Sequence, residues 1–249
     1  MPPLKIGMTV RSGGDPRFVE VHRAFHLAAG VDIVAAPGAQ LDADWIIESD
    51  VDEFWWPRGG SLRELLGVVP EGYGAVAAVA RSFVPIRDDG DPFYERMVYR
   101  YSSPVAVVDA AGAPLLPVRR SIRRTRDPSP RALRGWYPVE VLHVPVGAPE
   151  TYGPAEVERG LAEGVLCEDT RLRDAIRTIE AGAELEFQRP SVVEDALFAA
   201  DVAVLGDVDV IRTHERLDAL EGRLALLEST LPARLERRLR ALLGRRGAR

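Results

Sequence analysis

Apolar positions in the first 36 residues follow the pattern of a strand, then a helix, then a second strand. Residues 4–10 form a short apolar run with β-branched side chains, which predicts a strand. Residues 16–29 carry apolar side chains at helical spacing, and Gly30 is a typical helix stop. The strand pattern returns at residues 31–36, so we expect two parallel strands joined by a right-handed crossover.

Beyond this unit, short apolar runs alternate with amphipathic segments. We expect further strands at residues 45–47, 73–84, 95–101, 105–109 and 139–144. We expect further helices at residues 61–69, 154–163, 168–180 and 191–200. This alternation is typical of the α/β class, and it predicts a mixed, mainly parallel sheet flanked by helices.

The last part of the chain has a different pattern, a leucine seam. Leucines recur there at alternating steps of three and four residues, at Leu217, Leu220, Leu224, Leu227 and Leu231. Pro232 interrupts this heptad seam, and a second amphipathic helix follows. We expect a domain at residues 1–206 and a helical, basic tail at residues 207–249. The seam either pairs two chains into a homodimer or packs on its own domain, and we favour pairing.

Composition limits the classes of protein and site to be considered. The chain has 249 residues, 46% of them hydrophobic, enough for one large α/β domain with an appendage. Its single cysteine, Cys167, excludes a disulfide framework and a cysteine-based zinc or iron–sulfur site. No apolar run approaches the roughly 20 residues that span a bilayer, and no secretory signal is visible. We therefore expect a cytoplasmic protein.

The net charge of −6 conceals two basic segments. Residues 118–135 and residues 232–249 each contain seven arginines and one acidic residue. An acidic body with two basic segments argues against nucleic-acid binding and favours local anions, such as phosphates or an anionic membrane surface. The basic tail would then contact the inner face of the membrane peripherally.

The first basic segment, residues 118–135, contains the turn-forming sequence Asp-Pro-Ser-Pro and predicts an irregular, mobile loop. Two interpretations stay open. The loop either closes over a diphosphate or an anionic, lipid-linked acceptor, or it is a solvated segment that balances the acidic body.

An acidic motif directly follows the apolar strand at residues 45–47. Asp50 and Asp52 lie where ligands bind in open α/β sheets, beyond the carboxyl end of a strand. Two carboxylates there need compensation, and a divalent cation such as Mg²⁺ or Mn²⁺ supplies it while neutralising a leaving diphosphate. The alternative is a strand that merely ends in an acidic turn, which accounts for most bare Asp-x-Asp pairs.

The segment ADWIIESDVDEFWWPRGGSLRELL resembles the central part of glycosyltransferase family 2-like proteins, which have a GT-A fold. Those proteins carry a strand that ends in Asp-x-Asp-Glu-Phe, followed by a Gly-x-Leu turn into a helix. The resemblance continues through YGAVAAVARSFVP, DDGDPFYERM and RGWYPVEVLHVP, over roughly residues 4–174. It implies a GT-A-like sheet and metal-dependent transfer of a sugar from a nucleotide-sugar to a hydroxyl acceptor, in glycan or cell-surface polysaccharide synthesis.

The resemblance also implies roles for individual residues. Asp52 would bind the divalent cation directly, and Asp50 would lie near the ribose and the metal. Arg11 corresponds to the first residue of the family's Arg-Asp-Glu and would contact the nucleotide. His143 would be a third contact to the metal or the diphosphate, although a core or loop histidine is an equal alternative.

An inverting transferase also needs a base for the acceptor hydroxyl. The family's base is often an Asp at the head of a helix, and the best match is Glu168-Asp169. Two acids at a helix N-terminus are also favourable without any catalytic role, and we slightly favour this plain interpretation. Glu53, beside the metal motif, is the other candidate base.

The chain departs from the family's pattern around the expected nucleotide pocket. Arg11 is followed by Ser-Gly-Gly, the second strand ends in Ala-Ala-Pro, and the stretch from Gln40 to the acidic motif is short. A helix and a strand that normally build the pocket are therefore missing. The alternative function is a non-catalytic adaptor that self-associates or binds partners through its C-terminal helices.

Two histidines lie one helical turn apart in the first helix. His22 and His26 could both face one metal ion, but the sequence offers no further ligand nearby. A solvated or partly buried helix face is therefore the favoured interpretation.

Overall fold

The computed structural model describes residues 3–11, 16–86, 92–102, 119–125, 132–133, 139–145 and 152–189. The chain divides into two compact units, Met1–Val202 and Ala203–Arg249, and all described residues belong to the first. The strand expected at residues 105–109, the helix at residues 191–200 and the tail at residues 207–249 lie outside the described residues. Among the described helices, none has the length and apolar character needed to cross a membrane.

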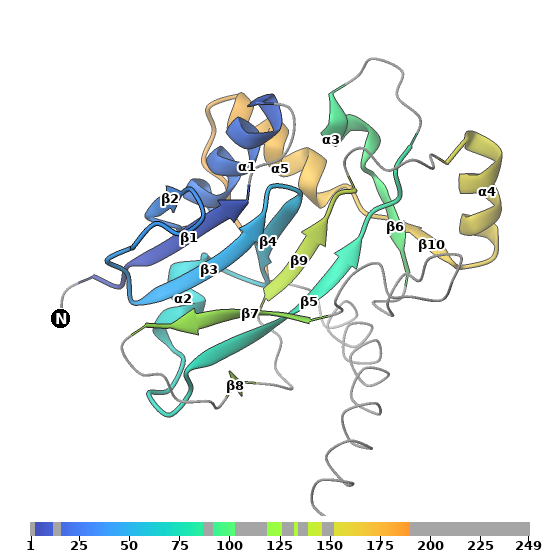
Figure 1. The fold of residues 1–249 in the computed structure, drawn as a ribbon. Coiled ribbons are helices and arrows are strands. Elements are labelled where there is room, and N and C mark those ends of the chain that lie inside the picture. The colour runs from blue at the N-terminus through green and yellow to red at the C-terminus, as the bar shows by residue number, and fades with distance from the viewer. Residues whose placement is uncertain are drawn as a thin grey trace, which may run out of the picture. The chain divides into compact units, whose positions relative to one another are not determined.

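The described elements are strands and runs of strands separated by single helices (Figure 1). In chain order they are β1 (Ile6–Arg11), α1 (Pro16–Ala28), β2 (Ile33–Ala35), β3 (Trp45–Asp50), β4 (Glu53–Pro57), α2 (Leu62–Gly67), β5 (Ala75–Ser82), α3 (Phe93–Arg96), β6 (Tyr99–Tyr101), β7 (Arg119–Arg124), β8 (Ala132–Leu133), β9 (Val139–His143), α4 (Pro154–Ala162), β10 (Leu166–Glu168) and α5 (Arg171–Glu180).

The larger sheet of the described residues is mixed. Its strand order is β2-β1-β3-β7-β5-β9-β4, with β8 paired to β5. The pairs β1–β2, β1–β3 and β5–β9 are parallel, whereas β7 runs antiparallel between β3 and β5 and β4 runs antiparallel to β9. A smaller sheet pairs β6 with β10. The expected mixed α/β fold with flanking helices is therefore confirmed.

The β1-α1-β2 unit forms as its periodicity predicts. Phe18 and Phe25 on one face of α1 are buried in the core, and Gly30 ends the helical segment with a φ of 100°, in the left-handed region. The carboxylate of Asp32 then accepts a hydrogen bond from the backbone N–H of Ile6, which ties β2 to β1. Helix α2 likewise begins at a capping box between Ser61 and Glu64.

Two expected elements differ from the structure. Residues 95–101 are not one strand, because α3 occupies Phe93–Arg96 before β6 begins. Pro92 supplies the helix-compatible start, and its carbonyl accepts the N–H of Glu95. The helix expected from residue 168 begins only at Arg171, because Glu168 pairs with Tyr99 as the last residue of β10.

The first basic segment is also not an irregular loop throughout. Its residues 119–124 form β7, between β3 and β5. Ile122 points into the core, and the guanidinium of Arg124 lies 4.7 Å from the centre of the Trp45 ring. Arg124 also donates to the carbonyls of Val69 and Glu71, so an arginine-rich strand is held by packing and by backbone acceptors.

Candidate functional site

The acidic motif forms a tight turn between β3 and β4. Glu53 is buried, and its carboxylate accepts a hydrogen bond from the backbone N–H of Asp50 at 3.1 Å. The hydroxyl of Ser49 donates to the carbonyls of Asp50 and Glu53, at 3.0 and 3.2 Å. The indole N–H of Trp55 donates to the same hydroxyl at 3.0 Å. Glu53, a candidate base in the sequence, therefore makes the contacts of a residue that braces this turn.

Two buried histidines of α1 hydrogen-bond to the backbone of Glu53 and Trp55, at and just after the turn. The structure corrects the expectation of a solvated or partly buried face, because His22 and His26 are both fully enclosed. The Nε2 of His22 donates to the carbonyl of Glu53 at 3.0 Å, and the Nδ1 of His26 donates to the carbonyl of His22 at 2.8 Å. The Nε2 of His26 accepts the backbone N–H of Trp55, so its partners require a neutral ring. The periodicity of apolar residues did not predict this burial, because histidine was counted as polar although its neutral ring packs like an apolar one.

The structure brings Asp52 and His143 together at the turn. Strand β4 pairs with β9 in a register that places Glu53 opposite His143, and the Nε2 of His143 lies 3.3 Å from a carboxylate oxygen of Asp52. Burial raises the pKa of Asp52, but the hydrogen bond and charge of His143 outweigh it and bring the pKa below its usual value. The Nδ1 of His143 is buried and has no hydrogen-bond partner among the described residues.

Asp50 and Arg11 form a separate pair beside this contact. They end the parallel strands β3 and β1, whose register places them directly opposite each other. The guanidinium of Arg11 contacts both carboxylate oxygens of Asp50, at 2.7 and 2.9 Å. Within the described part of the chain, no three histidine, cysteine or acidic side chains form a group that could hold a metal ion. Of the three predicted metal ligands, the structure thus brings only Asp52 and His143 into direct contact.

A pocket of about 670 Å³ is lined by residues of β4, β5, β6, β9, β10 and α5, and by residues of the segments that follow β4, β10 and α5. Most of its lining residues are charged or polar: Arg58, Arg81, Arg100, Glu140, Glu168, Asp169, Thr170, Arg171, Asp174, Thr178, Glu186, Gln188 and Arg189. Trp56, Ala175 and Leu185 complete the lining. Sequence reasoning named only Glu168 and Asp169 of this set.

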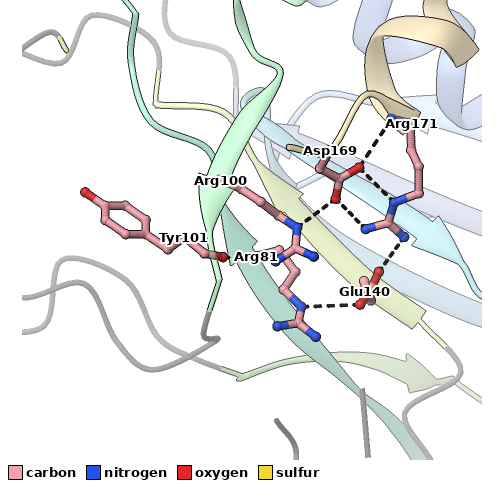
Figure 2. Close-up of polar contacts among 6 residues, drawn as sticks. All are labelled: Arg81, Arg100, Tyr101, Glu140, Asp169 and Arg171. Atoms are coloured by element: carbon pink, nitrogen blue, oxygen red, sulfur yellow. Dashed lines mark hydrogen bonds and ion pairs between the residues drawn. The ribbon is translucent and has the colours of Figure 1, made fainter. Parts of the chain in front are cut away.

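Five residues of the pocket lining form an ion-pair network (Figure 2): Arg81, Arg100, Glu140, Asp169 and Arg171. Asp169 accepts from the Nε of Arg100 at 2.7 Å and from two side-chain nitrogens of Arg171 at 2.9 and 2.7 Å. Glu140 accepts from Arg171 at 2.7 Å and from Arg81 at 3.3 Å. Arg171 therefore joins the two carboxylates, and its guanidinium also lies 5.4 Å from the centre of the Trp56 ring.

The network keeps both carboxylates ionised. Burial raises the pKa of Asp169, but the hydrogen bonds and charges of Arg171 and Arg100 outweigh it and lower the pKa to about 2. The pKa of Glu140 is lowered as well, because the charges of Arg171 and Arg81 outweigh its burial. A carboxylate with so low a pKa is a weak proton acceptor. Glu168, by contrast, has an exposed side chain at the same pocket.

One signal in the sequence could have located the network. Arg81 lies within the apolar run of β5 and Glu140 within that of β9, and both side chains are buried. Buried charges need partners, so two opposite charges in two buried strands predict a pair. Arg100 and Arg171 carry no such signal, because both lie in mainly polar surroundings of the sequence.

The acidic turn and the pocket are connected through neighbouring strands. His143 pairs with Ser82 of β5, and the next residue, Phe83, bridges to Arg100 of β6. Neighbouring strands lie about 4.8 Å apart, so the backbones of His143 and Arg100 are separated by roughly 10 Å. In comparisons with known proteins, no family model and no curated protein matches this chain.

Proposed function

We propose that this chain is a metal-dependent glycosyltransferase with a GT-A-like domain, which moves a sugar from a nucleotide-sugar to a hydroxyl acceptor. The observation that carries the proposal is the contact between Asp52 and His143 at 3.3 Å, at the acidic turn that follows a buried strand. The mixed sheet places this turn at the carboxyl ends of β1 and β3, where α/β proteins bind ligands.

The residues of the turn suit a divalent cation that arrives together with a diphosphate. Mg²⁺ and similar cations often take only one or two protein carboxylates and complete their coordination with phosphate oxygens and water. Asp52 offers a carboxylate and His143 an imidazole, a combination that suits Mn²⁺. When bound, the cation would neutralise the negative charge on the departing diphosphate.

Arg11 and Asp50 fit the nucleotide side of this site. Their ion pair lies at the ends of adjacent parallel strands, and the side chain of Arg11 is mostly exposed. An exposed guanidinium can exchange a carboxylate partner for a phosphate at little cost. Arg11 would then bind the diphosphate, and Asp50 would lie near the ribose and the cation.

We assign the acceptor to the pocket, because the backbone of Arg100 in its lining lies roughly 10 Å from that of His143 at the acidic turn. Glu168 is the better placed base, since its exposed carboxylate lines the pocket and, among the described residues, makes none of the arginine contacts that weaken Asp169 as a proton acceptor. Asp169 would act as a base only after release from Arg100 and Arg171. In the folded state its role is to hold these two guanidinium groups.

The first experiment measures the thermal unfolding midpoint with UDP, GDP, TDP and CDP, with and without Mn²⁺. A ligand at 100 times its dissociation constant stabilises the folded state by about 2.7 kcal/mol, which gives an easily measured shift. We expect one nucleotide to stabilise the wild type only with Mn²⁺, and Asp52→Ala to lose this response. Asp42→Ala, which removes an exposed acid paired with Lys5, is the matched control and should keep it.

The same data can reject the proposal. No response to any nucleotide in the folded wild-type protein, or an equal response in Asp52→Ala, would contradict it. Removal of the metal with EDTA should abolish the nucleotide response in the wild type, and its persistence would mean that binding does not involve the acidic turn.

A further inference from the structure

The charges that line the pocket balance one another. Among the described residues, the lining contains as many arginines as acidic residues: Arg58, Arg81, Arg100, Arg171 and Arg189 against Glu140, Glu168, Asp169, Asp174 and Glu186. The summed charge of these residues is therefore zero, and net charge selects neither an anionic nor a cationic ligand.

The buried charges of the lining already have partners within the protein. The side chains of Arg81, Glu140 and Asp169 are only 2%, 4% and 4% exposed. The carboxylate of Asp169 accepts hydrogen bonds from both Arg100 and Arg171. Arg81 makes interactions beyond its contact with Glu140. A charged ligand group would have to separate such a pair and leave a buried charge uncompensated, which is costly.

The exposed part of the lining offers both hydrogen-bond donors and acceptors. Carboxylates only accept, and guanidinium groups only donate. Glu168 and Glu186 supply exposed acceptors, and Arg189 supplies exposed donors. The exposed amide of Gln188 does both. An uncharged hydroxyl group donates to a carboxylate and accepts from a guanidinium, so it bonds to both kinds of side chain without separating an ion pair.

We propose that this pocket binds an uncharged sugar, whose hydroxyl groups bond to the carboxylates and the guanidinium groups alike. The pocket volume of about 670 Å³ lies in the range of small-molecule sites. Trp56, Ala175 and Leu185 are the apolar minority of the lining, which suits the C–H groups of a sugar ring. An acyl chain does not fit, because it would leave many charged side chains without water or partners.

As an assignment of the acceptor, this inference rests on the proposed function and deepens it: the hydroxyl that receives the transferred sugar belongs to a neutral saccharide. The binding itself uses none of the residues of the acidic turn. It is therefore measured in EDTA and without nucleotide, and Asp52→Ala should bind the sugar as the wild type does. Failure of sugar binding is thus distinguishable from failure of the nucleotide response.

Saturation-transfer difference NMR tests the binding, with glucose, galactose and mannose as probes. The uronate and the amino sugar with the same ring as the best probe are the matched controls, in a buffer that keeps the amine protonated. We expect at least one neutral sugar to bind, and both charged counterparts to bind at least threefold more weakly. Absence of binding by all three neutral sugars, or tighter binding of a charged counterpart, would overturn the proposal.

A bulky substitution locates the binding. Thr178 lies on α5 in the pocket lining and is half-buried, so Thr178→Tyr places a ring in the space that the ligand would occupy. We expect the dissociation constant of the best neutral sugar to rise at least tenfold. Arg177→Tyr is the control, because this exposed neighbour on α5 lies outside the lining, and its dissociation constant should stay within twofold of the wild type. Equal weakening in both variants would contradict the assignment.

Two substitutions at exposed positions test the balance of charge. Glu168→Gln keeps the side-chain shape and leaves the lining positive, so the uronate should gain severalfold in affinity relative to the neutral sugar at low ionic strength. Arg189→Gln leaves it negative and should favour the amino sugar instead. Glu158→Gln, on the exposed face of α4 and outside the lining, is the control and should leave both ratios unchanged. Ratios that stay constant in all three variants would overturn the proposal.

Discussion

At the scale of single residues, the buried histidines of α1 make stability depend on pH. Burial lowers the pKa of His22 from 6.5 to about 4, against the opposing effects of its hydrogen bond to Glu53 and the charge of Asp52. Burial and the charge of His22 bring the pKa of His26 well below 6.5. The unfolded chain therefore binds more protons than the folded one below pH 6.5, and stability falls as the pH falls.

We expect the free energy of unfolding to drop by about 1 kcal/mol for each histidine between pH 7.5 and pH 5.5. Urea unfolding at the two pH values measures this drop. The variant His22→Gln places an amide nitrogen near the position of Nε2 and has no titrating ring, so its drop should be smaller. A wild-type stability that stays constant or rises toward pH 5.5 would contradict the assignment of neutral, buried rings.

At the scale of elements, the hydroxyl of Ser49 is one of the groups that hold the β3–β4 turn. Ser49 bonds to two carbonyls of the turn and accepts the buried indole N–H of Trp55. Ser49→Ala removes the hydroxyl that accepts the buried indole N–H of Trp55 and that donates to the two carbonyls, and we expect a loss of about 1–3 kcal/mol in the free energy of unfolding. Ser121→Ala, at an exposed position of β7, is the control and should stay near the wild type. Chemical denaturation measures the free energy of unfolding of both variants. Equal values would show that the hydroxyl of Ser49 does not stabilise the turn.

Some of these elements could be predicted from the sequence and others could not. The β1-α1-β2 unit was predictable, because its apolar spacing and its glycine stop are local signals. Strand β7 was not, because its arginines hide the apolar alternation, although Arg124 packs on Trp45 and donates to two carbonyls. A resemblance implied roles for Asp52 and His143, but it did not predict the contact between them. The register of β4 and β9 that creates it joins residues 90 positions apart and leaves no local trace.

At the scale of the whole described region, the ion-pair network joins the two sheets. Arg81 and Glu140 belong to the larger sheet, Arg100 to the smaller one and Arg171 to α5. Buried charges in two apolar strands predict the pair of Arg81 and Glu140. No local pattern predicts that Arg100 and Arg171, from two further segments, join them. Acid should loosen the connection, because Asp169 is ionised in the folded state down to about pH 2.

The histidines and Asp169 both make the protein less stable as the pH falls, but for different reasons. Burial disfavours the charged form of His22, whereas Arg171 and Arg100 favour the charged form of Asp169. The pKa of Asp169 is lowered from 3.8 to about 2, so its stabilisation is present above pH 4 and is lost between about pH 4 and pH 2. We expect a loss of about 2 kcal/mol in this window in the wild type, and a smaller loss in Asp169→Asn. Acid titration of the unfolding free energy measures both, and identical slopes would contradict the ion-pair assignment.

The turn at Asp50 and Asp52 has a consequence for how such a protein changes over generations. Its shape is held by Ser49, Glu53 and His22, whereas the two aspartate carboxylates face Arg11 and His143. A lineage can therefore exchange either aspartate and keep the folded turn. A single substitution would then separate this architecture from the metal-dependent chemistry proposed for it.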